Sequence, residues 1–231
     1  MGRKIAVFDL DGTLIHTAPD LLDALNHSLA GDGLDIVGAE GFGRALGSGG
    51  RVMIETAHRA QNRALTPEAL ERMYRVFLDH YAGNIPGKSL PFPGVLDALD
   101  RLSAEGYLLA ICTNKTEALA LKLIEGLQLR ERFSAICGVD TFLHCKPDPR
   151  HLLETIEMAN GDPSRALMVG DSRTDIDTAK AAGIPVIAVD FGYTDQHVKV
   201  FEPSVVISHY NELTVEMAER LIAAGNGERR P

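Results

Sequence analysis

Near its N-terminus the chain reads Val7-Phe8-Asp9-Leu10-Asp11-Gly12-Thr13-Leu14, a short apolar run that ends in two carboxylates. The apolar residues 5–8, bounded by Asp and Gly, predict a buried strand. Residues i and i+2 of a strand share a face, so Asp9 and Asp11 start on one side until the turn at Gly12 redirects the second. Two neighbouring carboxylates repel each other unless a cation or a shared proton lies between them. This favours an oxygen-liganded Mg²⁺ site, and an ordinary Asp-Gly surface turn is the alternative.

Composition limits the classes of protein that the chain can represent. Its 231 residues suit one large domain or a domain with an insertion. The net charge of -9 argues against non-specific binding to nucleic acid or anionic membranes. No apolar segment approaches the length of a membrane span, and the N-terminal run is too short for a signal peptide. The cysteines, Cys112, Cys137 and Cys145, have no CxxC spacing, which favours reduced thiols and a cytoplasmic location.

The segment after the first strand is predicted to be entirely helical. Apolar residues at helical spacing predict helices from Pro19, over 51–61 and after a Thr66 N-cap. Residues 83–94 are rich in glycine and proline, as in a linker. We therefore expect an inserted all-helical domain at residues 16–87.

Beyond this insertion the pattern changes to short apolar strands that alternate with helices. The expected strands are 107–112, 135–139, 166–169, 185–189 and 204–207, and the expected helices are 94–105, 116–127, 149–159, 174–182 and 211–224. Alternation of this kind predicts a parallel sheet covered by helices on both faces. The prediction is an α/β protein with a Rossmann-like parallel sheet, formed by residues 1–15 and 88–225, and a disordered tail at 226–231.

Polar side chains follow the predicted strands at the edge where such sheets bind ligands. Asp9 ends the first strand, Thr113-Asn114 follows the second, Lys146 comes after the third, and Asp171 ends the fourth. Asp175 falls in the next helical turn. Each has an ordinary explanation by itself, because helix caps, surface lysines and acids in first helical turns are common.

Other catalytic patterns are missing from the sequence. The glycine-rich stretch 47–50 lacks the Gly-Lys-Ser/Thr of a nucleotide-binding loop. The histidines have no zinc-site spacing, and no Gly-x-Ser-x-Gly elbow occurs. These observations leave the polar groups at the strand ends as the candidate site.

Taken in order, four segments resemble the motifs of haloacid dehalogenase-like phosphohydrolases. They are Asp9-Leu10-Asp11-Gly12-Thr13, Thr113-Asn114, Lys146-Pro147 and Gly170-Asp171-Ser172-x-x-Asp175. The helical insertion resembles the small helical cap of that superfamily. The chain is most similar to its phosphoglycolate phosphatase group, with one departure at His16, where the group usually has an acid. We expect His16 at the mouth of the site.

The resemblance implies roles for the carboxylates. Asp9 would be the nucleophile that forms an aspartyl-phosphate, and Asp11 the general acid and base. Mg²⁺ would be held by Asp9, by Asp171 and by the backbone carbonyl of Asp11. Asp175 would orient Lys146 or a metal-bound water.

The resemblance also implies a phosphate site made by Thr113, Asn114 and Lys146. A substrate carboxylate needs a basic or N–H-rich partner, for which we expect Arg44 and the backbone around Ser48. A solvated helix end is the alternative for Arg44.

The predicted function is Mg²⁺-dependent hydrolysis of a small phosphomonoester, 2-phosphoglycolate, to glycolate and phosphate by a monomer or homodimer. Another phosphate ester, pyrophosphate, or a phosphoglucomutase-like mutase reaction remain alternatives, because mutases share all four motifs. A phospho-accepting signalling domain is more distant, since such receivers are about half this length and lack Asp-x-Asp-Gly-Thr. A non-catalytic binding module would require loss of the nucleophile, and Asp9 is present.

Overall fold

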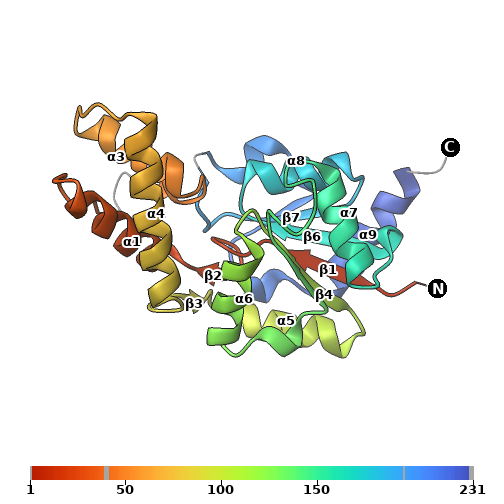
Figure 1. Ribbon diagram of the computed structural model, residues 1–231. Coiled ribbons are helices and arrows are strands. Elements are labelled where there is room, and N and C mark those ends of the chain that lie inside the picture. The colour runs from red at the N-terminus through yellow and green to blue at the C-terminus, as the bar shows by residue number, and fades with distance from the viewer. Residues whose placement is uncertain (1, 39–41, 195, 229–231) are drawn as a thin grey trace.

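A six-stranded sheet forms the centre of the computed structural model, which describes residues 2–38, 42–194 and 196–228 (Figure 1). Its strands are β1 (Ile5–Phe8), β4 (Leu108–Cys112), β5 (Ala135–Cys137), β6 (Ala166–Gly170), β7 (Val186–Val189) and β8 (Val205–Ile207). They lie in the order β5-β4-β1-β6-β7-β8, and each neighbouring pair is parallel. The predicted Rossmann-like α/β sheet is thus confirmed.

Helices cover both faces of the sheet, which is why its strands are apolar throughout. The covering helices are α5 (Val95–Ala104), α6 (Glu117–Gly126), α7 (Pro149–Met158), α8 (Arg173–Ala181) and α9 (Val215–Glu228). Ala6 and Phe8 of β1 belong to the core that includes α5 and α6. Ile5 and Val7 point the other way, into the core that includes α7 and α8. The alternation of side chains along the strand therefore packs β1 against both helical layers.

The inserted segment is helical, as expected. It contains α1 (Ala18–Gly31), α2 (Gly43–Leu46), α3 (Gly50–Ala60) and α4 (Pro67–Asn84). These helices gather to one side of the sheet, at the end far from both chain termini (Figure 1). Thr66 caps α4 by accepting a hydrogen bond from Ala69 N at 3.2 Å, as its position before Pro67 predicted.

The two chain segments that connect the main sheet to the helical segment form a short sheet with each other. β2 (Ile15–His16) lies antiparallel to β3 (Leu90–Pro91) in a separate two-stranded sheet. This pairing was not predicted, because two-residue strands carry no readable periodicity. It brings the entry and exit of the segment 16–87 together at one place beside the end of β1.

The C-terminal helix differs from the prediction at both ends. A short 3-10 turn, Tyr210–Glu212, occupies the expected start, so α9 begins at Val215. The helix then continues to Glu228, into the stretch 226–231 for which we expected disorder; residues 229–231 lie outside the described part of the chain. Among the described residues, no helix combines the length and apolarity that crossing a membrane requires.

Candidate active site

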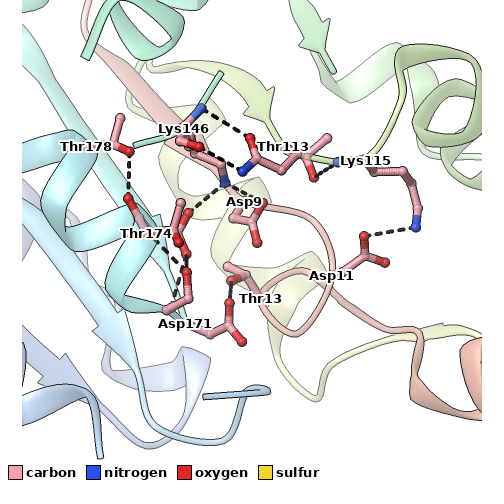
Figure 2. Close-up of polar contacts among 12 residues, drawn as sticks. Asp9, Asp11, Thr13, Thr113, Lys115, Lys146, Asp171, Thr174 and Thr178 are labelled. Atoms are coloured by element: carbon pink, nitrogen blue, oxygen red, sulfur yellow. Dashed lines mark hydrogen bonds and ion pairs between the residues drawn. The ribbon is translucent and has the colours of Figure 1, made fainter. Parts of the chain in front are cut away.

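The polar residues at the strand ends surround one point at the carboxyl edge of the sheet, as Figure 2 shows. They line a cavity of about 490 Å³ together with residues of the helical segment. The core contributes Asp9, Asp11, Thr113, Asn114, Lys115, Lys146 and Asp171, and the helical segment contributes Gly47, Ser48, Gly49, Tyr74, Phe77 and Tyr81. The cavity therefore lies where the two parts of the chain face each other.

Lys146 joins two carboxylates inside this site. Its Nζ lies 2.7 Å from Asp9 Oδ1 and 2.6 Å from Asp175 Oδ1, and the lysine is 4% exposed. Burial alone would lower the pKa of Lys146, but the carboxylates of Asp175 and Asp9 outweigh it and raise the pKa above its ordinary value. Lys146 is therefore a permanent cation that fixes one oxygen of Asp9.

Asp175 is engaged through both of its oxygens. While Oδ1 meets Lys146, Oδ2 accepts hydrogen bonds from Ser172 N at 3.1 Å and from Ser172 Oγ at 2.6 Å. Ser172 and Asp175 form the capping box that begins α8. The helix start thus holds the carboxylate that positions Lys146.

Asn114 binds the backbone of Lys146 from the neighbouring strand end. Its Nδ2 donates to Lys146 O at 2.9 Å, and its Oδ1 accepts from Lys146 N at 3.1 Å. The same N–H lies 3.2 Å from His151 Nδ1. Burial and then the nearby Lys146 lower the pKa of His151 to about 4, so this imidazole is neutral and can accept the bond. Thr113 Oγ1 accepts from Lys115 N at 3.2 Å.

Asp171 is held by the turn that follows β1 and by the loop after β7. Thr13 Oγ1 donates to its Oδ1 at 3.2 Å, and Tyr193 N donates to its Oδ2 at 2.6 Å. A Cβ on Gly12, whose φ is +80°, would lie 2.4 Å from Asp171 Oδ2, and one on Gly192 would lie 2.2 Å from the Asp171 side chain. Glycine is required at both positions because the carboxylate fills the space of a side chain.

Three carboxylates form a group that could hold a metal ion. Single oxygen atoms of Asp9, Asp171 and Asp175 lie within 4.8 Å of one another. Burial raises the pKa of Asp9 to about 6, although Lys146 acts in the opposite direction. Burial and the neighbouring carboxylates of Asp175 and Asp9 raise the pKa of Asp171 well above its ordinary range. An all-oxygen donor set with this excess of negative charge fits Mg²⁺.

The carboxylate of Asp11 lies outside this group. Its Oδ2 is 2.9 Å from Lys115 Nζ, and Figure 2 shows it turned away from Asp9. Lys115 Nζ also lies 4.6 Å from the centre of the Tyr81 ring, in a cation–π contact. Burial opposes the charge on Lys115, but Asp11 and Tyr81 raise its pKa overall.

Lys115 was not among the site residues predicted from the sequence. Its position two residues after Thr113, at the same strand end, was the signal that could have identified it.

The predicted residues of the helical segment have mixed outcomes. Ser48 lines the cavity, as expected. Arg44 belongs to α2, but its side chain lies outside the described part of the structure. His16 is exposed on β2, where its Nδ1 lies 3.0 Å from the Tyr193 hydroxyl. The described residues that line the cavity do not include His16, and its place at the mouth stays a prediction.

Comparison with known proteins agrees with this arrangement. The family model of the haloacid dehalogenase-like hydrolases matches residues 6–189. The chain is 66% identical over 224 residues to the phosphoglycolate phosphatase of Mesorhizobium japonicum, covering 97% of this chain and 99% of that protein. It is 46% identical to the phosphoglycolate phosphatase of Agrobacterium fabrum, covering 96% and 95% of the two chains. The crystal structure of a predicted phosphoglycolate phosphatase from Haemophilus somnus superposes with a TM-score of 0.84 at 27% identity, covering 91% and 96%.

A parallel sheet whose strand ends carry this carboxylate and lysine site is typical of a hydrolase with a Rossmann-like fold. The chain belongs to the haloacid dehalogenase-like hydrolase family. Its relatives over almost the full length are enzymes that act as phosphoglycolate phosphatases.

Proposed function

We propose that this chain is a Mg²⁺-dependent phosphoric monoester hydrolase that converts 2-phosphoglycolate to glycolate and phosphate. The observation that carries the proposal is the ion pair between Lys146 Nζ and Asp9 Oδ1, at the edge of a cavity that Asp171 also lines. One oxygen of Asp9 is held by the lysine, which leaves the other to attack phosphorus in line and form an aspartyl-phosphate. The substrate follows from the likeness to the phosphoglycolate phosphatases.

Asp9, Asp171 and the backbone carbonyl of Asp11 are the proposed holders of Mg²⁺. Asp175 is the third member of the carboxylate group, but Lys146 and Ser172 occupy both of its oxygens, so we assign it to the positioning of Lys146. When bound, the ion neutralises charge and lets an anionic phosphate approach the carboxylates.

The phosphate would be received by Thr113, Lys146 and the backbone of Asn114. The side-chain amide of Asn114 is engaged at both ends by Lys146, so its contribution to the phosphate site is through main-chain N–H and through the position of Lys146. Asp11 would give a proton to the leaving oxygen as the ester P–O bond breaks, and would later take a proton from the water that hydrolyses the aspartyl-phosphate, which releases phosphate and restores Asp9. Residues 16–87 would act as the cap over the core formed by 1–15 and 88–225.

Assay of the purified protein with Mg²⁺ against a panel of esters tests this function. The panel contains 2-phosphoglycolate, pyrophosphate, glucose 6-phosphate and p-nitrophenyl phosphate, with release of phosphate as the readout. We expect the highest kcat/KM for 2-phosphoglycolate. A higher kcat/KM for any other member, or conversion of β-glucose 1-phosphate to glucose 6-phosphate, would overturn the proposed substrate.

The remaining proposals concern the surroundings of the enzyme. The free thiols of Cys112, Cys137 and Cys145 support a reducing, cytoplasmic location. The oligomeric state, monomer or homodimer, stays a prediction, as do the contacts of Arg44 and Ser48 with substrate. Assay of Arg44→Ala tests the first of those contacts through KM for 2-phosphoglycolate; an unchanged KM removes Arg44 from the role.

A further inference from the structure

The substrate's second anionic group needs a partner in the cavity. In 2-phosphoglycolate a single CH₂ group separates the carboxylate from the ester oxygen. A phosphate seated beside Asp9 therefore keeps the carboxylate close to the strand ends, within reach of side chains that follow Thr113. Burying a carboxylate is costly unless a cation or several hydrogen-bond donors receive it.

Two lysines line the cavity among its described residues, Lys115 and Lys146. Lys146 is already shared between the carboxylates of Asp9 and Asp175. Lys115 pairs with Asp11 alone among the salt bridges of the described chain, and an ammonium group can donate three hydrogen bonds. Lys115 is thus the cation with capacity for a further anion.

The surroundings of Lys115 favour an anionic ligand. Its side chain is 7% exposed, and in such a site a charge-assisted hydrogen bond is strong because water competes little. Tyr81 of α4 lies against the ammonium, and its buried hydroxyl oxygen faces Lys115, which can only donate hydrogen bonds, so the hydroxyl proton has no acceptor among the described residues. A ligand oxygen placed beside Lys115 would accept this O–H as well as the ammonium hydrogens.

We propose that Lys115 and the Tyr81 hydroxyl receive the carboxylate of the substrate, and that this contact draws Lys115 away from Asp11. Lys115 is then a specificity-determining residue for the reaction. In the structure Asp11 is turned towards Lys115 and away from Asp9. A substrate carboxylate that shares the ammonium weakens this ion pair and frees Asp11 to turn towards the leaving oxygen. This inference rests on the proposed function, since it requires a substrate with a carboxylate next to its phosphate ester.

The test compares 2-phosphoglycolate with ethyl phosphate, the same ester with a methyl group in place of the carboxylate. KM and kcat are measured for both with the wild type and with Lys115→Met. We expect KM for 2-phosphoglycolate to rise about 10-fold to 100-fold and KM for ethyl phosphate to change by less than about twofold. Lys115→Arg keeps the charge and is expected to retain part of the preference.

If Lys115 recognises the substrate carboxylate, Lys115→Met raises KM for 2-phosphoglycolate and not for ethyl phosphate, whereas a purely structural role affects both esters. Equal losses for both esters would overturn the inference and leave Lys115 as a positioning residue for Asp11. If Lys115→Met does not fold, Lys115→Gln carries the same comparison, because its amide still donates to Asp11. Failure of the proposed function is visible earlier, as a wild type that hydrolyses ethyl phosphate but not 2-phosphoglycolate.

Lys122 provides the matched control. It lies on α6 with its Nζ bonded to Ala82 O of α4, so it also links the sheet domain to the helical segment, but it does not line the cavity. Lys122→Met is expected to leave the ratio of the two KM values unchanged. A change of this ratio in Lys122→Met as large as that in Lys115→Met would overturn the inference. So would a ratio that changes in Arg44→Ala but stays at the wild-type value in Lys115→Met. Tyr81→Phe is expected to raise KM for 2-phosphoglycolate selectively, by about 10-fold.

Discussion

Lys146 Nζ lies 2.7 Å from Asp9 Oδ1, although 137 residues separate the two in the chain. The same Nζ contacts Asp175, so a single buried cation balances two buried carboxylates. Such groups are favourable only as a set, because each would be costly alone.

Removal of Lys146 is therefore expected to damage both stability and activity. Lys146→Met leaves Asp9 and Asp175 buried without their cation, which costs about 3–5 kcal/mol of unfolding free energy. We expect kcat/KM to fall about 100-fold or more, because the cation that faces the phosphate is gone. Denaturant unfolding and phosphate release measure the two effects.

Lys180 and Asp175 supply the controls for this prediction. Lys180 is an exposed lysine of α8 bonded to Phe201 O at 2.7 Å, and Lys180→Met should cost less than about 1 kcal/mol and spare activity. Lys146→Met with Asp175→Asn should regain part of the stability but none of the activity. Stability of Lys146→Met equal to that of the wild type would show that the ion pairs do not form.

Asp9→Asn is expected to abolish hydrolysis of p-nitrophenyl phosphate. An amide is a poor nucleophile, so kcat should fall about a thousandfold or more. Since burial raises the pKa of Asp9 to about 6, the ionised carboxylate costs stability at neutral pH, and the variant is expected to melt no lower than the wild type in EDTA. Substantial turnover by a folded Asp9→Asn protein would refute the nucleophile assignment.

Asn114 binds both the N–H and the C=O of Lys146, so its removal is expected to lower activity by more than destabilisation alone explains. Asn114→Ala removes both hydrogen bonds to the Lys146 backbone, at a cost of about 1–3 kcal/mol, and lets Lys146 leave its position. We expect kcat/KM to fall at least about 10-fold.

Asn26 offers a matched control within the same chain. Its side-chain amide bridges Val37 in the same way, donating to Val37 O at 2.9 Å and accepting from Val37 N at 2.8 Å, in the helical segment. Asn26→Ala should lower the melting temperature similarly while kcat/KM stays within about twofold of the wild type. Equal losses of activity in the two variants would mean that general destabilisation explains both.

Removal of metal is expected to abolish activity and to make stability depend on pH. A carboxyl whose pKa rises from 3.8 to about 6 on folding binds more protons in the folded state. The stability that protonated Asp9 contributes is therefore present at low pH and is lost as the pH rises from 3.8 to about 6. Mg²⁺ binds the ionised carboxylates, so its stabilising effect should grow as protons leave.

The measurement is the rise in melting temperature when Mg²⁺ is added to EDTA-treated protein. We expect a small rise at about pH 5 and a larger one at about pH 7.5, together with return of activity. Asp171→Asn should reduce the rise at the higher pH. An equal rise at both values, or activity that survives EDTA, would contradict the metal assignment.

Much of the fold was predictable because its signals are local. The apolar run before Asp9 and the Pro67 start of α4 each lie within a few residues of the element they predict. The β2–β3 pairing escaped prediction because two-residue strands have no period. The late start of α9 depends on a 3-10 turn whose hydrogen bonds are made only in the folded chain.

The sequence alone determined the chain order of the six strands of the main sheet, the helices between them and the polar residues that follow the strands, because all of these depend on neighbouring residues. Tertiary structure decided which of those residues meet. The order of the strands in the sheet brings Lys146 to Asp9 and Asp175, and Asp11 turns towards Lys115. Which way a buried carboxylate points, and which cation it contacts, depend on its desolvation and on charged residues from distant parts of the chain. No local sequence pattern specifies those contacts.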